Sequence, residues 1–291
     1  MNVRLAETAG FCYGVERAVS TVYDEISAGG RKIYTYGPIV HNDTVTGELE
    51  AKGVGVIGSA EELKRMADSG ELDGSSVIIR AHGVGKDIFG ILEKAPGDVR
   101  VIDATCPFVK KIHQAVIRHK AAGEKILVTG TASHPEVIGI LGQIGNDAVV
   151  IESVQDAENL NIDKDARYCL VSQTTFNVQK FQDIIDILKK KLYDVNIVDT
   201  ICNATQLRQR EARALSRECD AMIVIGGKHS SNTAKLFDIC SKECSMTYFI
   251  ESLQDFTEKL DSSVRCVGIT AGASTPKTII QEVLRYVRDE F

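Results

Sequence analysis

Short runs of apolar, β-branched residues recur along the chain and alternate with longer segments in which apolar residues are three or four positions apart. Runs such as ILVT at 126–129 and CLVS at 169–172 have the length and composition of buried strands. Between residues 15 and 26 the apolar spacing is that of one face of a helix. Strands that alternate with helices favour βαβ units, so the predicted fold class is α/β with mainly parallel sheets.

The pattern repeats three times along the chain. Segments that end in a cysteine recur at Cys12, Cys106 and Cys202, separated by 94 and 96 residues. Each third is expected to hold four short strands, which in the middle third are VRVID, ILVT, AVVI and CLVS. Self-similarity at a fixed period predicts repeated structural units, and here three similar α/β lobes around a pseudo-threefold axis. Their expected bounds are 13–105, 106–201 and 202–291, with residues 1–12 joining the third lobe and a C-terminal helix over 276–291.

Two polar loops follow each cysteine at similar distances. One lies about 28 residues after the cysteine and the other about 70 residues after it, each at the end of an apolar strand. The aligned residues are His41, His134 and Ser230 in the first set, and His82, Thr174 and Ser274 in the second. Ligands bind beyond the carboxyl ends of parallel strands. The cysteines and loops are therefore expected to converge on one central cavity.

Composition narrows the classes of function. The 291 residues are 44% hydrophobic and 25% charged, enough for a large core. A net charge of -6 gives no basic signal for extended nucleic-acid binding. The N-terminus lacks the apolar core of a signal peptide, and no apolar run approaches the roughly 18 residues that span a bilayer. We expect a cytoplasmic protein with neither nucleic-acid nor membrane partners.

Eight cysteines in such a chain are better explained as thiols, metal ligands or core residues than as disulfides. Five of them are expected to pack in the core, where a cysteine behaves as a small apolar residue. For the two that are four residues apart, a pair of thiols on one helix face is the alternative. These are Cys169, Cys219, Cys240, Cys244 and Cys266.

The other three, at 12, 106 and 202, share a strand-end context as well as a period. A packing cysteine copied by duplication is one explanation. Three thiolates meeting on an axis would repel one another unless a cation offset their charge, which favours a metal centre. Zinc with three cysteines and an open site fits, as does a 4Fe-4S cluster with one iron left for substrate. The spacing does not choose between the two metals.

The histidines divide by context. His113 and His119 lie in the helix predicted after Cys106 and are expected at the surface, whereas His41, His82 and His134 lie in loops, where function concentrates. Simple loop capping is the alternative for each of these three. Glu136, two residues after His134, could favour a helix N-terminus or donate a proton.

The segment GGKHSSNTAK contains Ser230, Ser231 and Asn232. A polar run of this kind can serve as a helix N-cap. It also suits anion binding, because the backbone N–H groups at a helix start attract phosphate.

Nine motifs together resemble those of the 4-hydroxy-3-methylbut-2-enyl diphosphate reductases of the LytB/IspH type. In chain order they are GFCYGVERA, GPIVHN, RAHGV, DATCP, HPEVIG, SQTT, DTICNAT, GGKHSSN and AGASTP. One departure is His229, where family members usually carry Asn. The resemblance implies a 4Fe-4S cluster with three cysteine ligands and one open iron site, held by Cys12, Cys106 and Cys202. It implies that the diphosphate is held by His41, His82, His134, Ser230, Ser231, Asn232 and Ser274, and that Glu136 and Thr174 serve the reacting end.

The implied activity is reductive dehydroxylation of an allylic diphosphate to isopentenyl and dimethylallyl diphosphates, the last step of the methylerythritol phosphate pathway of isoprenoid biosynthesis. Electrons would come from a ferredoxin or flavodoxin-like donor, since no GxGxxG follows a predicted strand. Two other classes are an iron–sulfur hydro-lyase of the aconitase kind, which consumes no reductant, and a nonenzymatic iron–sulfur sensor.

Overall fold

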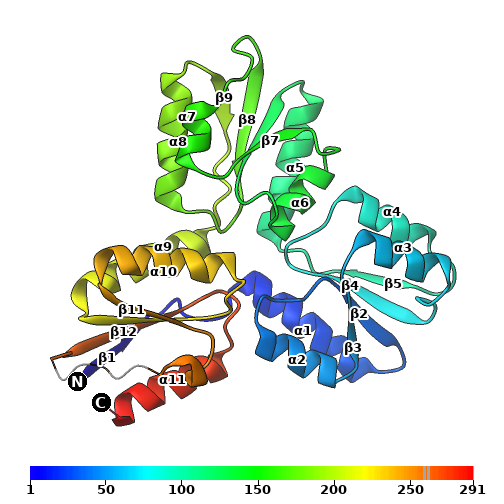
Figure 1. The fold of residues 1–291 in the computed structure, drawn as a ribbon. Helices are drawn as coiled ribbons and strands as arrows, with labels where there is room; N and C mark the ends of the chain where they lie inside the picture. The colour runs from blue at the N-terminus through cyan, green and yellow to red at the C-terminus, as the bar shows by residue number, and fades with distance from the viewer. Residues whose placement is uncertain (258–259, 261–262, 291) are drawn as a thin grey trace. The chain divides into compact units, whose positions relative to one another are not determined.

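The computed structural model describes residues 1–257, 260 and 263–290, and these form three four-stranded sheets with helices between the strands (Figure 1). All strand pairs within the three sheets are parallel. The predicted α/β class is therefore confirmed. The chain divides into two compact units. The first is Met1–Glu16, Val40–Glu48 and Asn203–Phe291, and the second is Arg17–Ile39 and Leu49–Cys202.

The first unit contains one sheet, with strand order β1-β12-β10-β11. Its strands are β1 (Asn2–Leu5), β10 (Ala221–Ile225), β11 (Met246–Ile250) and β12 (Cys266–Ala271). Its helices are α9 (Asn203–Glu218), α10 (Ser231–Glu243), η1 (Leu253–Asp255) and α11 (Lys277–Glu290). Helices α9 and α10 pack on one face of the sheet and α11 on the other (Figure 1).

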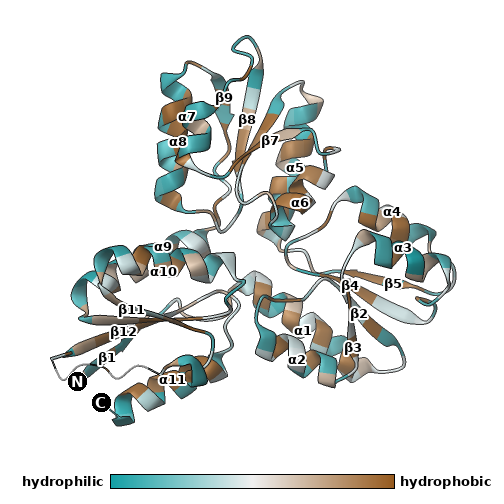
Figure 2. Ribbon diagram, viewed as in Figure 1, coloured by the Kyte–Doolittle hydropathy of each residue, from teal (hydrophilic) through white to brown (hydrophobic). Residues whose placement is uncertain are grey.

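Burial on both faces explains why β10 is a continuous apolar run with every residue buried. The predicted C-terminal helix is confirmed as α11. Its apolar residues all face the sheet, which leaves a hydrophilic outer surface (Figure 2).

The second unit contains two sheets, with orders β3-β2-β4-β5 and β7-β6-β8-β9. The strands of the former are β2 (Lys32–Tyr36), β3 (Val54–Ile57), β4 (Ser75–Ile79) and β5 (Arg100–Asp103). Those of the latter are β6 (Lys125–Thr129), β7 (Ala148–Ile151), β8 (Arg167–Ser172) and β9 (Asp194–Ile197). The remaining helices are α1 (Tyr13–Ala28), α2 (Asp43–Ala51), α3 (Ala60–Asp68), α4 (Lys86–Lys94), α5 (Pro107–Ala121), α6 (Pro135–Gly142), α7 (Val154–Asn159) and α8 (Val178–Lys190). Helices α1 and α2 have residues in both units, and α3 to α8 lie in the second. None of the helices in the described part of the chain is long and apolar enough to cross a membrane.

Strand β5, the VRVID run, does not belong to the sheet of the middle third. It pairs with β4, with Ile102 beside Ile78, and β9 takes the corresponding place beside β8. Strand β1 likewise pairs with β12. The strand before each cysteine is thus an edge strand. Strands β5 and β9 join the sheet formed by the three strands that precede them in the chain, and β1 joins the sheet formed by the last three strands. Counting VRVID among the strands of the middle third was wrong, because strand pattern does not specify the pairing partner. The run lies at residues 99–103, within the bounds 13–105 expected for the first lobe, and these bounds stay a prediction.

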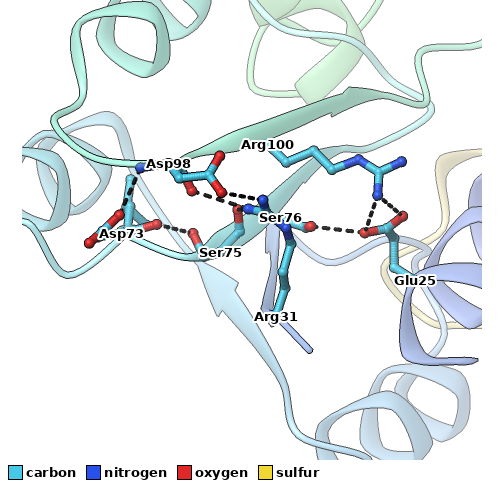
Figure 3. A network of polar contacts seen from close by, with 8 residues as sticks. Glu25, Arg31, Asp73, Ser75, Ser76, Asp98 and Arg100 are labelled. Atoms are coloured by element: carbon cyan, nitrogen blue, oxygen red, sulfur yellow. Dashed lines mark hydrogen bonds and ion pairs between the residues drawn. The ribbon is translucent and has the colours of Figure 1, made fainter. Parts of the chain in front are cut away.

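A polar network joins the amino-terminal ends of β2, β4 and β5 (Figure 3). Arg31 donates to the main-chain oxygen of Asp98 at 3.1 Å and pairs with its carboxylate. Glu25 accepts a hydrogen bond from Ser76 Oγ at 2.8 Å and pairs with Arg100 at 3.1 Å. These contacts lie at the ends of the strands opposite the predicted site loops.

Candidate functional site

The predicted site residues all follow the carboxyl end of a strand or lie in the first turn of the next helix. Both units carry some of them. The first unit contains Cys12, His41, Ser230, Ser231, Asn232 and Ser274, and the second contains His82, Cys106, His134, Glu136, Thr174 and Cys202. Convergence of the full set on one cavity stays a prediction, and each group is described within its own unit.

Glu136 and Thr174 form a buried polar pair in the second unit. The Glu136 side chain is 2% exposed and accepts hydrogen bonds from the Thr174 N–H at 2.6 Å and from its hydroxyl at 2.7 Å. Charge-assisted bonds of this length are strong, and they hold the carboxylate in one position. The sequence pointed to both residues separately, and the structure brings them together.

Helix α6 positions that carboxylate. Pro135 occupies the first helical position, where its fixed φ suits the helix, and His134 Nδ1 accepts from the Glu136 N–H at 3.1 Å as the N-cap. A carboxylate in the first turn is favoured by the positive end of the helix. The place of Glu136 in the first turn and its proposed chemical role are therefore compatible.

His82 and His134 lie next to each other. Their ring centroids are 5.4 Å apart in an edge-to-face arrangement with an interplanar angle of 75°. The loop after His82 needs a glycine, because Gly83 has a φ of +70° and a Cβ there would lie 2.8 Å from the His113 ring. Two imidazoles so placed offer donors to the same anionic group when protonated.

The loops of His41, Ser230 and Ser274 meet in the first unit. The hydroxyl of Ser274 lies 3.3 Å from the main-chain oxygen of His41 and 3.4 Å from Ser230 Oγ. A Cβ on Gly227 would lie 2.3 Å from that same oxygen of His41, so only glycine allows the two loops to approach this closely. Three loops that are far apart in sequence therefore present one polar surface.

Helix α10 begins within this surface. Ser230 is its N-cap and accepts from the Thr233 N–H at 3.3 Å. Asn232 is buried, and its Nδ2 has no acceptor among the described residues. A helix start with an unsatisfied amide donor suits an anionic ligand. Lys235, which was not among the predicted residues, donates to Ser231 Oγ at 2.7 Å, and its spacing of four from Ser231 was the available signal.

The three repeated cysteines have similar backbone environments. Cys106 is the N-cap of α5, while Cys12 and Cys202 come directly before α1 and α9. The N–H of Cys12 donates to Ala273 at 3.3 Å, that of Cys106 to Ala81 at 2.9 Å and that of Cys202 to Thr174 at 3.1 Å. Each cysteine is thus tied to a loop of the second aligned set. All three are partly exposed and none is in a disulfide.

The cysteines expected in the core follow that expectation with one exception. Cys169, Cys219, Cys240 and Cys244 are buried, whereas Cys266 is partly exposed because it is the first residue of β12.

The expectation that His113 and His119 lie at the surface was wrong. His113 is 9% exposed, because α5 turns this side toward its sheet together with Val109, Ile112 and Val116. Burial lowers the pKa of His113 to about 4. The side chain of His119 is 12% exposed and lies 2.9 Å from a carboxylate oxygen of Glu124.

Comparison with known proteins gives a consistent result. The sequence model of the family described as LytB protein matches residues 3–288. The 4-hydroxy-3-methylbut-2-enyl diphosphate reductase of Thermoanaerobacter sp. (strain X514) is 44% identical over 289 residues, which covers 99% of this chain and 97% of the relative. The enzyme of the same name from Clostridioides difficile (strain 630) is 40% identical over 289 residues, 99% of this chain and 100% of the relative.

Two solved structures agree with this result. The E-1-hydroxy-2-methyl-but-2-enyl-4-diphosphate reductase from Plasmodium falciparum superposes with a TM-score of 0.90 at 30% identity, over 99% of this chain and 88% of that one. An (E)-4-hydroxy-3-methyl-but-2-enyl diphosphate reductase, described as the terminal enzyme of the non-mevalonate pathway, gives a TM-score of 0.69 at 37% identity, over 99% of this chain and 100% of that one. The resemblance carried by the nine motifs is confirmed.

Proposed function

Because the chain belongs to the LytB protein family, we propose that it is a 4-hydroxy-3-methylbut-2-enyl diphosphate reductase, the terminal enzyme of the non-mevalonate isoprenoid pathway. The reaction removes an allylic hydroxyl with two electrons and two protons, releases water and yields isopentenyl and dimethylallyl diphosphates. The observation that carries the proposal is the family match over residues 3–288, which includes every predicted site residue.

The donor set fits a 4Fe-4S cluster. Three cysteines without disulfides each stand at the start of a helix, where the positive end of the helix favours a thiolate. We assign Cys12, Cys106 and Cys202 as the ligands. When bound, such a cluster supplies electrons one at a time and a Lewis acid at the iron that no cysteine holds.

The diphosphate is assigned to the polar loops of the repeat. The Asn232 amide and the start of α10 offer N–H donors, and the paired imidazoles of His82 and His134 add positive charge when protonated. His41, Ser230, Ser231 and Ser274 complete the proposed set. Many aligned donors can bind a diphosphate with little fixed cationic charge, because hydrogen bonds to an ionised acceptor are strong.

Glu136 and Thr174 are assigned to proton delivery. Hydroxide is a poor leaving group, so a proton must reach the oxygen as its bond to carbon breaks. The Thr174 hydroxyl donates to the Glu136 carboxylate, so a proton held by the carboxyl group can pass through that hydroxyl to a neighbouring oxygen. Burial of the pair limits exchange of this proton with bulk water.

We further propose that electrons come from a ferredoxin or flavodoxin-like protein in the cytoplasm. The two alternative classes of protein, the hydro-lyase and the sensor, differ from a reductase in whether turnover consumes electrons. A hydro-lyase leaves the oxidation state of its substrate unchanged, and a sensor has no turnover at all.

The decisive experiment is an anaerobic assay with purified, cluster-loaded protein, the allylic diphosphate and a one-electron reductant. We expect two electrons to be consumed for each molecule of product, and no product from protein stripped of its cluster. Product formation without consumption of reductant would favour the hydro-lyase, and a cluster-loaded protein without turnover would favour the sensor.

A further inference from the structure

We propose that His119, Glu124 and Cys169 form a second metal site, for a thiophilic divalent cation such as zinc. The ligand atoms that the three residues offer all lie within 4.8 Å of one another. They come from the end of helix α5, the following turn and strand β8, all in the second unit. None of the three belongs to the residues assigned to the proposed reductase chemistry.

The turn after α5 fixes the relative positions of His119 and Glu124. The N–H of Glu124 donates to the carbonyl of His119 at 3.1 Å and the N–H of Gly123 to that of Lys120 at 3.0 Å. With Gly123 at a φ of +82°, this is a Schellman motif. The two residues that usually make an apolar contact across this motif are here a histidine and a glutamate. Their side chains meet at 2.9 Å, between Nδ1 and a carboxylate oxygen.

Cys169 contributes the third ligand from the sheet. Its side chain is fully buried on the face of β8 that packs against α5, beside the β6 residue Ile126. A histidine–glutamate contact by itself would only replace the apolar contact of a Schellman motif with a polar one, and would not indicate a metal site. A buried thiol within reach of that contact is the additional observation that points to a metal, because cysteine, histidine and carboxylate together are a typical donor set for zinc.

The charges balance for a divalent cation. Burial and the nearby Glu124 carboxylate raise the pKa of Cys169 to about 12, so without metal the group is a thiol. On binding, the S–H bond breaks, its proton goes to solvent, and a sulfur–metal bond forms. Nδ1 of His119 must be free of the proton that it shares with Glu124 in order to bind the metal, so the neutral imidazole carries its proton on Nε2. Thiolate and carboxylate then carry two negative charges against two positive ones. The guanidinium of Arg118 lies 3.5 Å from His119 Nε2, and because Arg118 is exposed, solvent screens its charge.

Metal binding requires the three side chains to rearrange, because their ligand atoms lie within 4.8 Å of one another and must reach the spacing of a coordination shell. Zinc–ligand bonds of about 2.0–2.3 Å in a tetrahedron separate neighbouring ligand atoms by about 3.3–3.6 Å. The contact between His119 and Glu124 would therefore open from 2.9 Å by about half an ångström, a side-chain adjustment. A water molecule would complete the coordination, as is usual where a protein supplies three ligands.

The test uses the full-length, cluster-loaded protein with zinc chloride, followed by removal of loosely bound metal. We expect one zinc per chain above the iron of the cluster. X-ray absorption at the zinc edge should show a single sulfur neighbour with nitrogen and oxygen atoms completing the shell. A shell of three or more sulfurs would place the zinc on other cysteines and overturn the proposal, as would the absence of saturable zinc binding.

Variants supply a second test. Cys169→Ala, His119→Ala and Glu124→Gln should each weaken zinc binding by about tenfold or more, because each removes one direct ligand. The matched control is Cys240→Ala, which removes another fully buried thiol that burial keeps protonated. It should bind zinc as the wild type does. Zinc should also raise the melting temperature of the wild type and of the control. Wild-type zinc affinity in Cys169→Ala would refute the assignment without reference to reductase activity.

Discussion

Replacing Glu136 by Gln separates the shape of this side chain from its capacity to hold a proton. In the native pair the carboxylate accepts from both the N–H and the hydroxyl of Thr174, at 2.6 and 2.7 Å. A glutamine oxygen can still accept from the N–H, while its NH₂ group turns toward the hydroxyl, which then accepts instead of donating. Both contacts survive, and the proton path between the two side chains is lost.

The cost to stability should be modest. Hydrogen bonds to a charged group contribute about 1.5–3 kcal/mol and neutral ones about 0.5–1.5 kcal/mol, so the two contacts together lose about 2 kcal/mol. A neutral amide is also easier to bury than a carboxylate, which offsets part of this loss. Turnover should fall much further, by about 100-fold or more, the usual contribution of a general acid.

The assay measures iron, sulfide, substrate affinity and turnover in the same anaerobic sample. We expect cluster content and affinity near the wild-type values and a loss confined to turnover. Thr174→Ser, which keeps the hydroxyl, should retain most activity, whereas Thr174→Val should not. Since residues of one relay do not act additively, Glu136→Gln combined with Thr174→Val should cost far less than the product of the single losses. Near-normal turnover of Glu136→Gln with an intact cluster would remove this residue from proton delivery.

Three further predictions concern other parts of the molecule. Serine in place of any one of the three proposed cluster ligands should deplete iron and abolish turnover, whereas Cys240→Ala should retain full iron content; retention of iron in all three serine variants would refute the ligand assignment. Asn232→Ala should weaken substrate binding by about 1.5–3 kcal/mol if its amide donates to the diphosphate, which calorimetry with the cluster-loaded protein would measure against wild type. The lowered pKa of His113 means that the unfolded chain takes up this proton first, so the free energy of unfolding should fall by up to about 3 kcal/mol between pH 6.5 and 4, and a His113→Leu variant lacking this decline would confirm its source.

Local patterns determined much of this protein from the sequence alone. Apolar spacing identifies strands and helices without reference to their partners, as with the C-terminal helix that was predicted over 276–291 and is α11. The repeat of one cysteine and two polar loops placed each candidate residue directly after a predicted strand. The carboxyl ends of parallel strands lie at one edge of a sheet, so the sequence alone predicted on which edge these residues lie. The predicted roles of these residues came from the motif resemblance and not from their positions in the sequence. The spacing of the three cysteines, for example, fits zinc as well as an iron–sulfur cluster.

Only the tertiary structure decided which segments meet. Strand β5 reads as part of the middle third, yet it pairs with β4, because hydrogen-bonding partners are chosen by long-range packing and not by strand composition. His113 shares a face of α5 with Val109, Ile112 and Val116, and the packing of that face against the sheet buries it although histidine is polar. The contact between Glu136 and Thr174, and the approach of Cys169 to His119 and Glu124, join residues from separate strands and helices. Such contacts depend on the register of parallel strands and on the packing of helices against them, which a linear pattern does not encode.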